Sequence, residues 1–147
     1  GRCMSSVIRG DDNFDSTPPS HGRVFRNSGN ITTTSTSLVD LTGASITLTT
    51  GANPVAYGTT QTTYNNSAGA LIIYNIDIDG ALQHGTAGQV QKATAAAEQT
   101  NLSFSGMSAA LSAGSHTVKV RWFVTAGTGT ILATAGNSHL FYAYEVK

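Results

Sequence analysis

The sequence predicts a single all-β domain, a jelly-roll sandwich of eight to ten antiparallel strands. Short segments from Gly22 onward alternate apolar and polar residues with the period of two that a half-buried strand requires. Turn residues separate these segments at intervals of roughly ten residues, which is typical of sandwiches and barrels. Threonine, which is β-branched and loses rotamer freedom in helices, is abundant, whereas only 11% of the 147 residues are charged.

Each expected strand has its own pattern. Gly43 ends the first alternation, and residues 71–78 begin apolar on both faces, which indicates a strand covered on both sides, in a core or against another chain. In residues 117–124 the valines and Trp122 form one face and Lys119 and Arg121 belong to the other. The expected strands lie, in order, at residues 39–41, 45–49, 55–66, 71–78, 102–105, 117–124, around 131 and at 140–146.

Two segments do not alternate. Residues 1–21 are polar, contain Pro18-Pro19 and show no periodicity, so we expect a flexible arm or linker that precedes a domain at 22–147. Residues 89–99 are the only helical candidate because of their alanines. No apolar stripe supports a helix there, and a loop or a single turn is equally compatible with the pattern.

Composition excludes several classes of protein. Eight basic and eight acidic residues give a net charge of zero, without the basic footprint that nucleic-acid binding normally requires. The longest apolar run is far too short to span a membrane. The lone Cys3 cannot form an intramolecular disulfide. A surface of Thr and Ser at zero net charge favours association over mutual repulsion.

No motif predicts catalysis, a metal site or a cofactor. Residues 77–80, Asp-Ile-Asp-Gly, resemble the start of a calcium loop, but no further carboxylate follows, and Asp-Gly between two strands indicates a type I′ hairpin turn. The four histidines are dispersed without metal-ligand spacing, and no strained nucleophile elbow appears. Outside the arm only Asp77 and Asp79 are close enough in sequence to act as paired carboxylates, and they serve the turn. We therefore expect a protein that is not an enzyme.

The aromatic residues are the best candidates for contact residues. At alternating strand positions they usually belong to a core or a subunit interface. Another interpretation is a carbohydrate-stacking set, formed by Trp122 and the five tyrosines, Tyr57, Tyr64, Tyr74, Tyr142 and Tyr144. The predicted core or subunit-interface anchors are Tyr74, Trp122, Phe123, Phe141, Tyr142 and Tyr144.

Three segments resemble phage tail-fibre and related virion surface domains. They are residues 34–49 (TSTSLVDLTGASITLT), 111–122 (LSAGSHTVKVRW) and 136–146 (GNSHLFYAYEV), within a resemblance that extends over about residues 23–147. The resemblance implies a jelly roll of tumour-necrosis-factor-like or complement-globular-head-like shape, commonly trimeric, on a virion appendage or capsid. It implies no catalytic residues.

Two functions follow as expectations. In the first, the protein is a tail-fibre or spike-tip domain that binds a glycan or protein of the host surface. In the second, it is a capsid decoration protein that stabilises the phage head through its N-terminal arm. In both it is a virion component whose main partner is itself, as a homotrimer that covers exposed sheet edges, without nucleic acid or membrane insertion.

Overall fold

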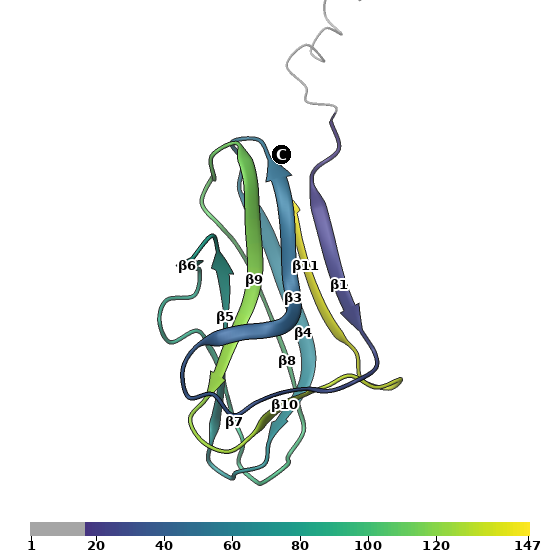
Figure 1. Ribbon diagram of the computed structural model, residues 1–147, viewed down its shortest axis with the longest axis vertical. Coiled ribbons are helices and arrows are strands. Elements are labelled where there is room, and N and C mark those ends of the chain that lie inside the picture. Colours follow the sequence, from purple (N-terminus) through teal and green to yellow (C-terminus); the bar gives the residue numbers. More distant parts are fainter. Residues whose placement is uncertain (1–16) are drawn as a thin grey trace, which may run out of the picture.

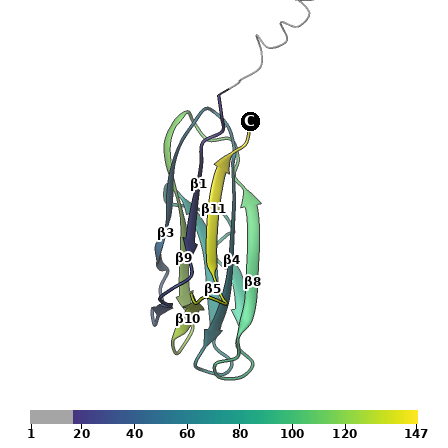
Figure 2. The same cartoon turned by 90° about the vertical axis from the view of Figure 1, so that its right-hand side faces the viewer.

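The computed structural model describes residues 17–147, and this part of the chain is all-β, without a helix (Figure 1). Its strands form two antiparallel sheets packed face to face, as the edge-on view shows (Figure 2). The strands are β1 (His21–Arg26), β2 (Ile31–Thr33), β3 (Val39–Thr50), β4 (Val55–Asn65), β5 (Leu71–Ile78), β6 (Ala81–Leu82), β7 (Gln89–Lys92), β8 (Thr100–Met107), β9 (Gly114–Val124), β10 (Gly129–Leu132) and β11 (His139–Glu145).

Sheet A contains β1, β2, β4, β8, β10 and β11, with β4 at its centre. One edge of β4 pairs with β8, and its other edge pairs first with β11 and then with β10. β1 and β2 extend the sheet beyond β11 and β10. The described residues form eleven strands where eight to ten were expected, because β1, β2, β6 and β7 were not expected, whereas the strands expected at 39–41 and 45–49 are one strand, β3.

Sheet B has the order β3, β9, β5, and the far edge of β5 pairs with β6 and β7. Consecutive strands repeatedly change sheets, and the first strand of the described chain pairs with the last. This connectivity is a jelly-roll sandwich, which confirms the predicted fold class.

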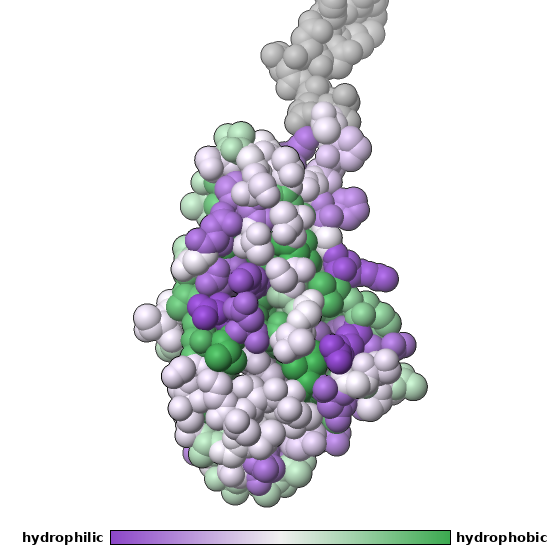
Figure 3. All heavy atoms as spheres, viewed as in Figure 1, coloured by the Kyte–Doolittle hydropathy of each residue, from purple (hydrophilic) through white to green (hydrophobic). Residues whose placement is uncertain are grey.

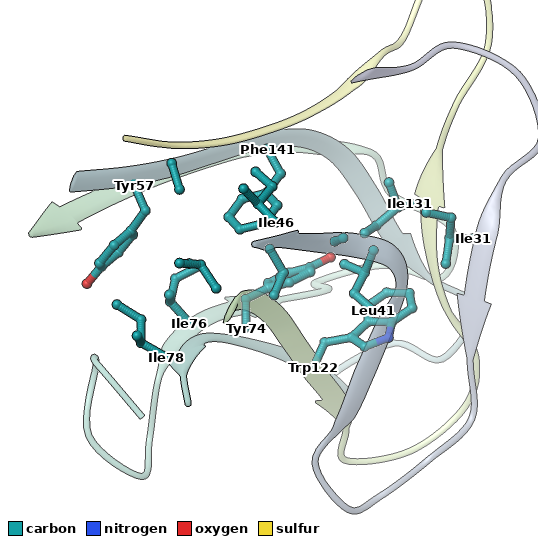
Figure 4. Close-up of a cluster of buried hydrophobic side chains, with 14 of the residues drawn as sticks. Ile31, Leu41, Ile46, Tyr57, Tyr74, Ile76, Ile78, Trp122, Ile131 and Phe141 are labelled. Carbon is teal, nitrogen blue, oxygen red and sulfur yellow. The ribbon is translucent and has the colours of Figure 1, made fainter. Parts of the chain in front are cut away.

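The core lies between the sheets and follows the predicted alternation (Figure 4). Val118, Val120, Trp122 and Val124 of β9 face inward and are at most 1% exposed. The Trp122 ring stacks on Tyr74, with ring centroids 5.8 Å apart. Large buried aromatic and branched side chains supply most of the stabilisation of such a core.

Local predictions had mixed outcomes. The type I′ turn is confirmed, because Asp79 and Gly80 have φ values of 52° and 92° and connect the paired residues Ile78 and Ala81. No helix forms in residues 89–99: β7 occupies 89–92, where Gln91 is buried and the alternation is that of a strand. Gly43 does not end a strand either. It lies in a bulge, between Asp40 and Ser45 in the register with β9, and β3 continues to Thr50.

The predicted arm lies mostly outside the described residues, and so does Cys3. Residues 17–20 lead into β1 beside the C-terminal strand. Glu145 fastens this junction, because its carboxylate accepts hydrogen bonds from the backbone N of Gly51 (2.7 Å), from Asn53 Nδ2 (2.8 Å) and from the backbone N of Ser20 (3.3 Å). In residues 17–147 no helix has the length and hydropathy needed to cross a membrane.

Candidate interaction surface

The outer faces of the two sheets differ in chemistry. Within the described residues four large hydrophobic side chains are exposed, and three of them, Phe25 (52%), Met107 (60%) and Tyr144 (44%), lie on the outer face of sheet A. The fourth, Val90, lies on sheet B. Exposed apolar side chains gathered on one sheet face indicate an interaction site.

An aromatic ridge runs along β1 and β11 on this face, and we define it as Phe25, Tyr142 and Tyr144. The rings of Tyr142 and Tyr144 stack with their centroids 6.3 Å apart and their planes 19° from parallel. The Arg23 guanidinium lies over the Phe25 ring, 5.7 Å from its centroid. Pro18, Pro19, His21, Arg23 and the two tyrosines of the ridge line an apolar hollow at the upper end of the ridge.

A trough of small residues lies beside the ridge, on β4 and β8, and we define it as Ala56, Gly58, Ser103 and Ser105. Gly58 pairs with Tyr142 on one side and with Ser105 on the other. A Cβ atom at Gly58 would overlap the Tyr142 phenol, so this position must be glycine if Tyr142 is to lie flat on β4. Met107 pairs with Ala56 at the end of the trough.

The face of sheet A carries no carboxylate among the described residues. Asp40, Asp77 and Asp79 belong to sheet B or its turn, Glu145 is 3% exposed and faces inward, and Glu98 lies in the loop after β7. Arg23, which lies over Phe25, is charged, but without acidic groups this face still has few charges to remove from water when another surface covers it.

The charged side chains on the outer face of sheet B gather near the middle of the face, and apolar patches lie beside them (Figure 3). Phe123, Ile73 and Val90 share this face. Asp40 forms ion pairs with Lys119 (3.1 Å) and Arg121 (3.1 Å), and Arg121 also approaches Asp77 at 3.5 Å. Exposed pairs of this kind stabilise a fold by only ~0–1 kcal/mol each. Their main effect is to keep this face hydrated.

Asp79 and His116 form the one His–Asp contact in the described part of the chain. His116 Nδ1 lies 2.5 Å from Asp79 Oδ2, and its Nε2 lies 2.7 Å from the Ser112 carbonyl oxygen. In a hydrolase, the second nitrogen would instead face the hydroxyl or thiol that it activates. This pair therefore does not have the geometry of a general base.

The predicted anchor residues are distributed over three places. Tyr74, Trp122 and Phe141 lie in the core at 0%, 1% and 0% exposure. Tyr142 and Tyr144 lie on the ridge. Phe123 lies on the outer face of sheet B, where it pairs with Ile73.

The aromatic residues do not gather into one carbohydrate-stacking platform. Tyr57, Tyr74 and Trp122 are at most 3% exposed, which leaves the rings of Tyr64, Tyr142 and Tyr144 accessible. Sequence analysis missed Phe25, Gly58 and Met107, because their importance depends on which strands pair. Within residues 17–147 no group of three or more His, Cys, Asp or Glu side chains is placed to hold a metal ion.

No protein-family model and no curated protein matches this sequence. Solved structures resemble it in fold. Eiger TNF from S. frugiperda shares 11% identity over 89% of this chain and 94% of its own, with a TM-score of 0.52. A structure of the infectious bursal disease virus Gx strain shares 12% identity over 89% of this chain and 38% of its own, with a TM-score of 0.45. A family 35 carbohydrate-binding module from an environmental isolate has 14% identity, 84% coverage of each chain and a TM-score of 0.36. The likeness to Eiger TNF agrees with the strand order: this chain is a jelly roll.

Proposed function

We propose that this protein is a non-enzymatic virion surface domain, a tail-fibre or spike-tip module that forms a homotrimer through the outer face of sheet A and binds the host surface. The observation that carries the proposal is the contrast between the two outer faces. One is apolar, aromatic and without acids, and the other carries a hydrated network of ion pairs. The virion location is supported by the resemblance of residues 34–49, 111–122 and 136–146 to virion surface domains.

The shape of the sheet A face supports a closed ring of three copies of the chain. The ridge and the trough adjoin each other, and Tyr142 of the ridge covers Gly58. The open part of the trough is the hollow beside Ser103, Ser105 and Tyr142, and an exposed ring of the next copy can pack there. Repeated around a three-fold axis, such a heterologous contact closes on itself and leaves no unsatisfied copy. Aromatic side chains that fill a groove of small residues are the usual energetic centre of a protein interface.

The positions of the two ends of the described chain support one orientation of the domain on a fibre. Lys147 Nζ donates to the Thr17 carbonyl oxygen (2.8 Å), and the Glu145 backbone N donates to the Ser20 carbonyl oxygen (2.7 Å). Both ends therefore lie at one end of the sandwich (Figure 1). If this end attaches to the virion, the opposite end faces the host.

The loops at that opposite end suit recognition of a neutral, hydroxyl-rich host ligand. They comprise residues 66–70, 93–99 and 125–128, and Glu98 is their only charged residue. Backbone hydrogen bonds hold them together, from Asn66 N to Thr128 O (3.1 Å) and from Ala97 N to Asn65 O (2.8 Å). Preorganised loops lose less entropy on binding than mobile ones.

Light scattering on three variants tests the self-association. Wild type should have the trimer mass at micromolar concentrations. Met107→Ser and Tyr144→Ser should give folded monomers, because both side chains are largely exposed in a single chain and contribute little to its stability. Val90→Ser removes a similarly exposed side chain from sheet B and should remain trimeric. A wild type that is monomeric throughout this range contradicts the proposal.

Host binding has its own test. Purified trimer should adsorb to host cells and block infection by the parent phage. Binding to capsids that lack the protein, abolished by deletion of residues 1–21, would instead identify a decoration protein. Hydrolysis of host-surface polysaccharide that is lost in Asp77→Asn would contradict both functions.

A further inference from the structure

His116 occupies an unusual position for a histidine. It continues the inward-facing row of β9 beyond Val118, and the residue is 7% exposed. Its two ring nitrogens contact two segments from different parts of the fold. Nδ1 lies 2.5 Å from the Asp79 carboxylate in the β5–β6 turn, and Nε2 lies 2.7 Å from the Ser112 carbonyl oxygen, before β9.

Both of these partners are acceptors. A carboxylate and a backbone carbonyl cannot donate a hydrogen bond, so each ring nitrogen must carry a proton if both contacts are to form. A neutral imidazole has one N–H only, and either tautomer would direct a lone pair at an oxygen. The geometry therefore requires the imidazolium form.

The two contacted segments hold the sheets together at this end. Residues 108–113 cross from β8 in sheet A to β9 in sheet B. The crossing is fixed to sheet A by a hydrogen bond from Ser108 N to Val55 O (2.9 Å) and by one from Leu111 N to Asn53 O (3.1 Å). Asp79 belongs to sheet B, where it also accepts a hydrogen bond from the Thr117 backbone N (2.8 Å). His116 thus links the turn of one sheet to the crossing between both.

We propose that His116 is a pH-sensitive clamp: its imidazolium form holds the β5–β6 turn and the 108–113 crossing together, and its deprotonation releases one of the two contacts. The charged groups around it are few. Asp79 is the carboxylate in contact with the ring. Asp77 accepts a hydrogen bond from the Gly80 backbone N and forms an ion pair with Arg121. Lys119 and Arg121 of β9 form ion pairs with Asp40. β3 places the apolar Leu48 opposite His116. The titration of His116 is therefore governed by Asp79.

The direction of the pH effect follows from these contacts. The hydrogen bond to Asp79, and then the one to Ser112, raise the pKa of His116 above its usual 6.5, and the bond from His116 lowers the pKa of Asp79. A base whose pKa is raised by folding contributes stability that is complete below its unfolded-state pKa and lost as pH rises through its folded-state pKa. The clamp is therefore complete below pH 6.5 while Asp79 is ionised, and it opens as pH rises through the raised pKa of His116.

Side-chain NMR of nitrogen-15-labelled protein tests the protonation state. In wild type at pH 6, both ring nitrogens of His116 should have the shifts of a protonated imidazolium. Asp79→Asn is the decisive variant. Asn-Gly also favours a type I′ turn and retains an oxygen for Thr117 N, so this variant removes the charge and preserves the turn. The His116 titration midpoint should then shift downward.

Amide hydrogen exchange tests the clamp itself. In wild type, exchange of the Thr117 and Leu111 amides, corrected for the intrinsic effect of pH, should accelerate as pH rises through the His116 midpoint. In Asp79→Asn the amide Nδ2 can donate to Nδ1 of the neutral ring while Nε2 donates to the Ser112 carbonyl oxygen, so exchange of the two amides should change little over the same pH range. Asp40→Asn removes a carboxylate from the same sheet without touching His116, and should behave as wild type does. A singly protonated His116 in wild type at pH 6, or the same pH response in wild type and Asp79→Asn, would overturn the proposal.

Discussion

Trp122 is the largest fully buried side chain, and its removal should lower the stability of the fold. Trp122→Ala would leave a cavity beside Tyr74, and we expect it to lower the free energy of unfolding by about 3–5 kcal/mol. Urea denaturation measures this loss. The adjacent Phe123 faces outward on sheet B, so Phe123→Ala should cost clearly less. A loss below about 1 kcal/mol for Trp122→Ala, typical of surface positions, would place the indole outside the core.

His139 makes the fold sensitive to acid. The residue is 1% exposed, its Nε2 lies 3.3 Å from Thr59 Oγ1, and burial, with a smaller contribution from Arg26, lowers its pKa from 6.5 to about 4. Between these values the unfolded chain binds a proton and the folded chain does not. The contribution of His139 to the free energy of unfolding is therefore complete above pH 6.5. It falls as pH decreases and levels off below about pH 4, after a loss of about 3 kcal/mol.

Urea midpoints measured from pH 7 to pH 4 check this expectation. His139→Gln retains a side-chain amide for Thr59 and has no proton to bind, so its stability should depend less on pH in this range. An identical dependence in wild type and variant would show that His139 does not control it.

These two histidines show the limit of sequence analysis for single side chains. His139 begins β11 and His116 is the third residue of β9, where an exposed or cross-strand role is ordinary, yet both are buried and hydrogen-bonded. Their partners Asp79 and Thr59 are 37 and 80 residues away in the sequence. Alternation identifies the face of a strand, and so it placed Trp122 correctly, but it does not identify which distant polar group meets an inward side chain.

The connection from β9 to β10 requires a glycine at position 127. Gly127 has a φ of 67°, and a Cβ atom there would meet the side-chain oxygens of Asn65, Asn66 and Ser67 at 2.5–2.6 Å. Asn65 Nδ2 also donates to the Ala126 carbonyl oxygen at 3.0 Å, so this connection cannot move away without breaking a contact.

Two glycine variants separate strain from steric overlap. Gly43 has a φ of 80°, similar to that of Gly127, and open space surrounds the position of a new methyl group. Gly43→Ala should therefore lower the free energy of unfolding only by the ~1–2 kcal/mol that left-handed backbone costs an L-residue. Gly127→Ala should lose more, because the overlap adds to the same strain. Thermal or urea unfolding measures both, and equal losses would mean that the connection relaxes around the methyl group.

Strands were predicted best where they are long and regular. Residues 45–49 and 117–124 alternate without interruption and lie within β3 and β9, and the Thr-rich segment 55–66 matches β4 to within one residue. β1 was missed because its apolar residues, Val24 and Phe25, are adjacent and do not alternate. The bulge in β3 was interpreted as an end, because a glycine with positive φ interrupts the pattern in both cases.

Assembly should appear in the thermal stability of the protein. If folded copies associate through the face of sheet A and unfolded chains do not, the melting temperature must rise with protein concentration. A melting curve recorded over a hundredfold range of concentration measures this rise. Met107→Ser should melt at a temperature that does not depend on concentration, and Val90→Ser should follow the wild type. A concentration-independent wild type would argue against an oligomeric native state.

Composition and alternation predicted the all-β class, and the sparse charge indicated association. They did not indicate which sheet would carry the proposed interface. That information depends on register, because Gly58, Tyr142 and Ser105 become neighbours only when β4 lies between β11 and β8. The pairing order of a jelly roll is a long-range property that no local pattern contains.

The pairing of β1 with β11 has a consequence for how the chain acquires its structure. His21 pairs with Tyr144, and Ser20 meets Glu145 across 125 residues of chain. During synthesis β1 therefore has no partner until the last strand has left the ribosome. Chains dominated by such distant pairings fold slowly, because the entropy of closing a long loop is lost before the contacts form. For this protein, the slowest step of folding should be the docking of its two ends.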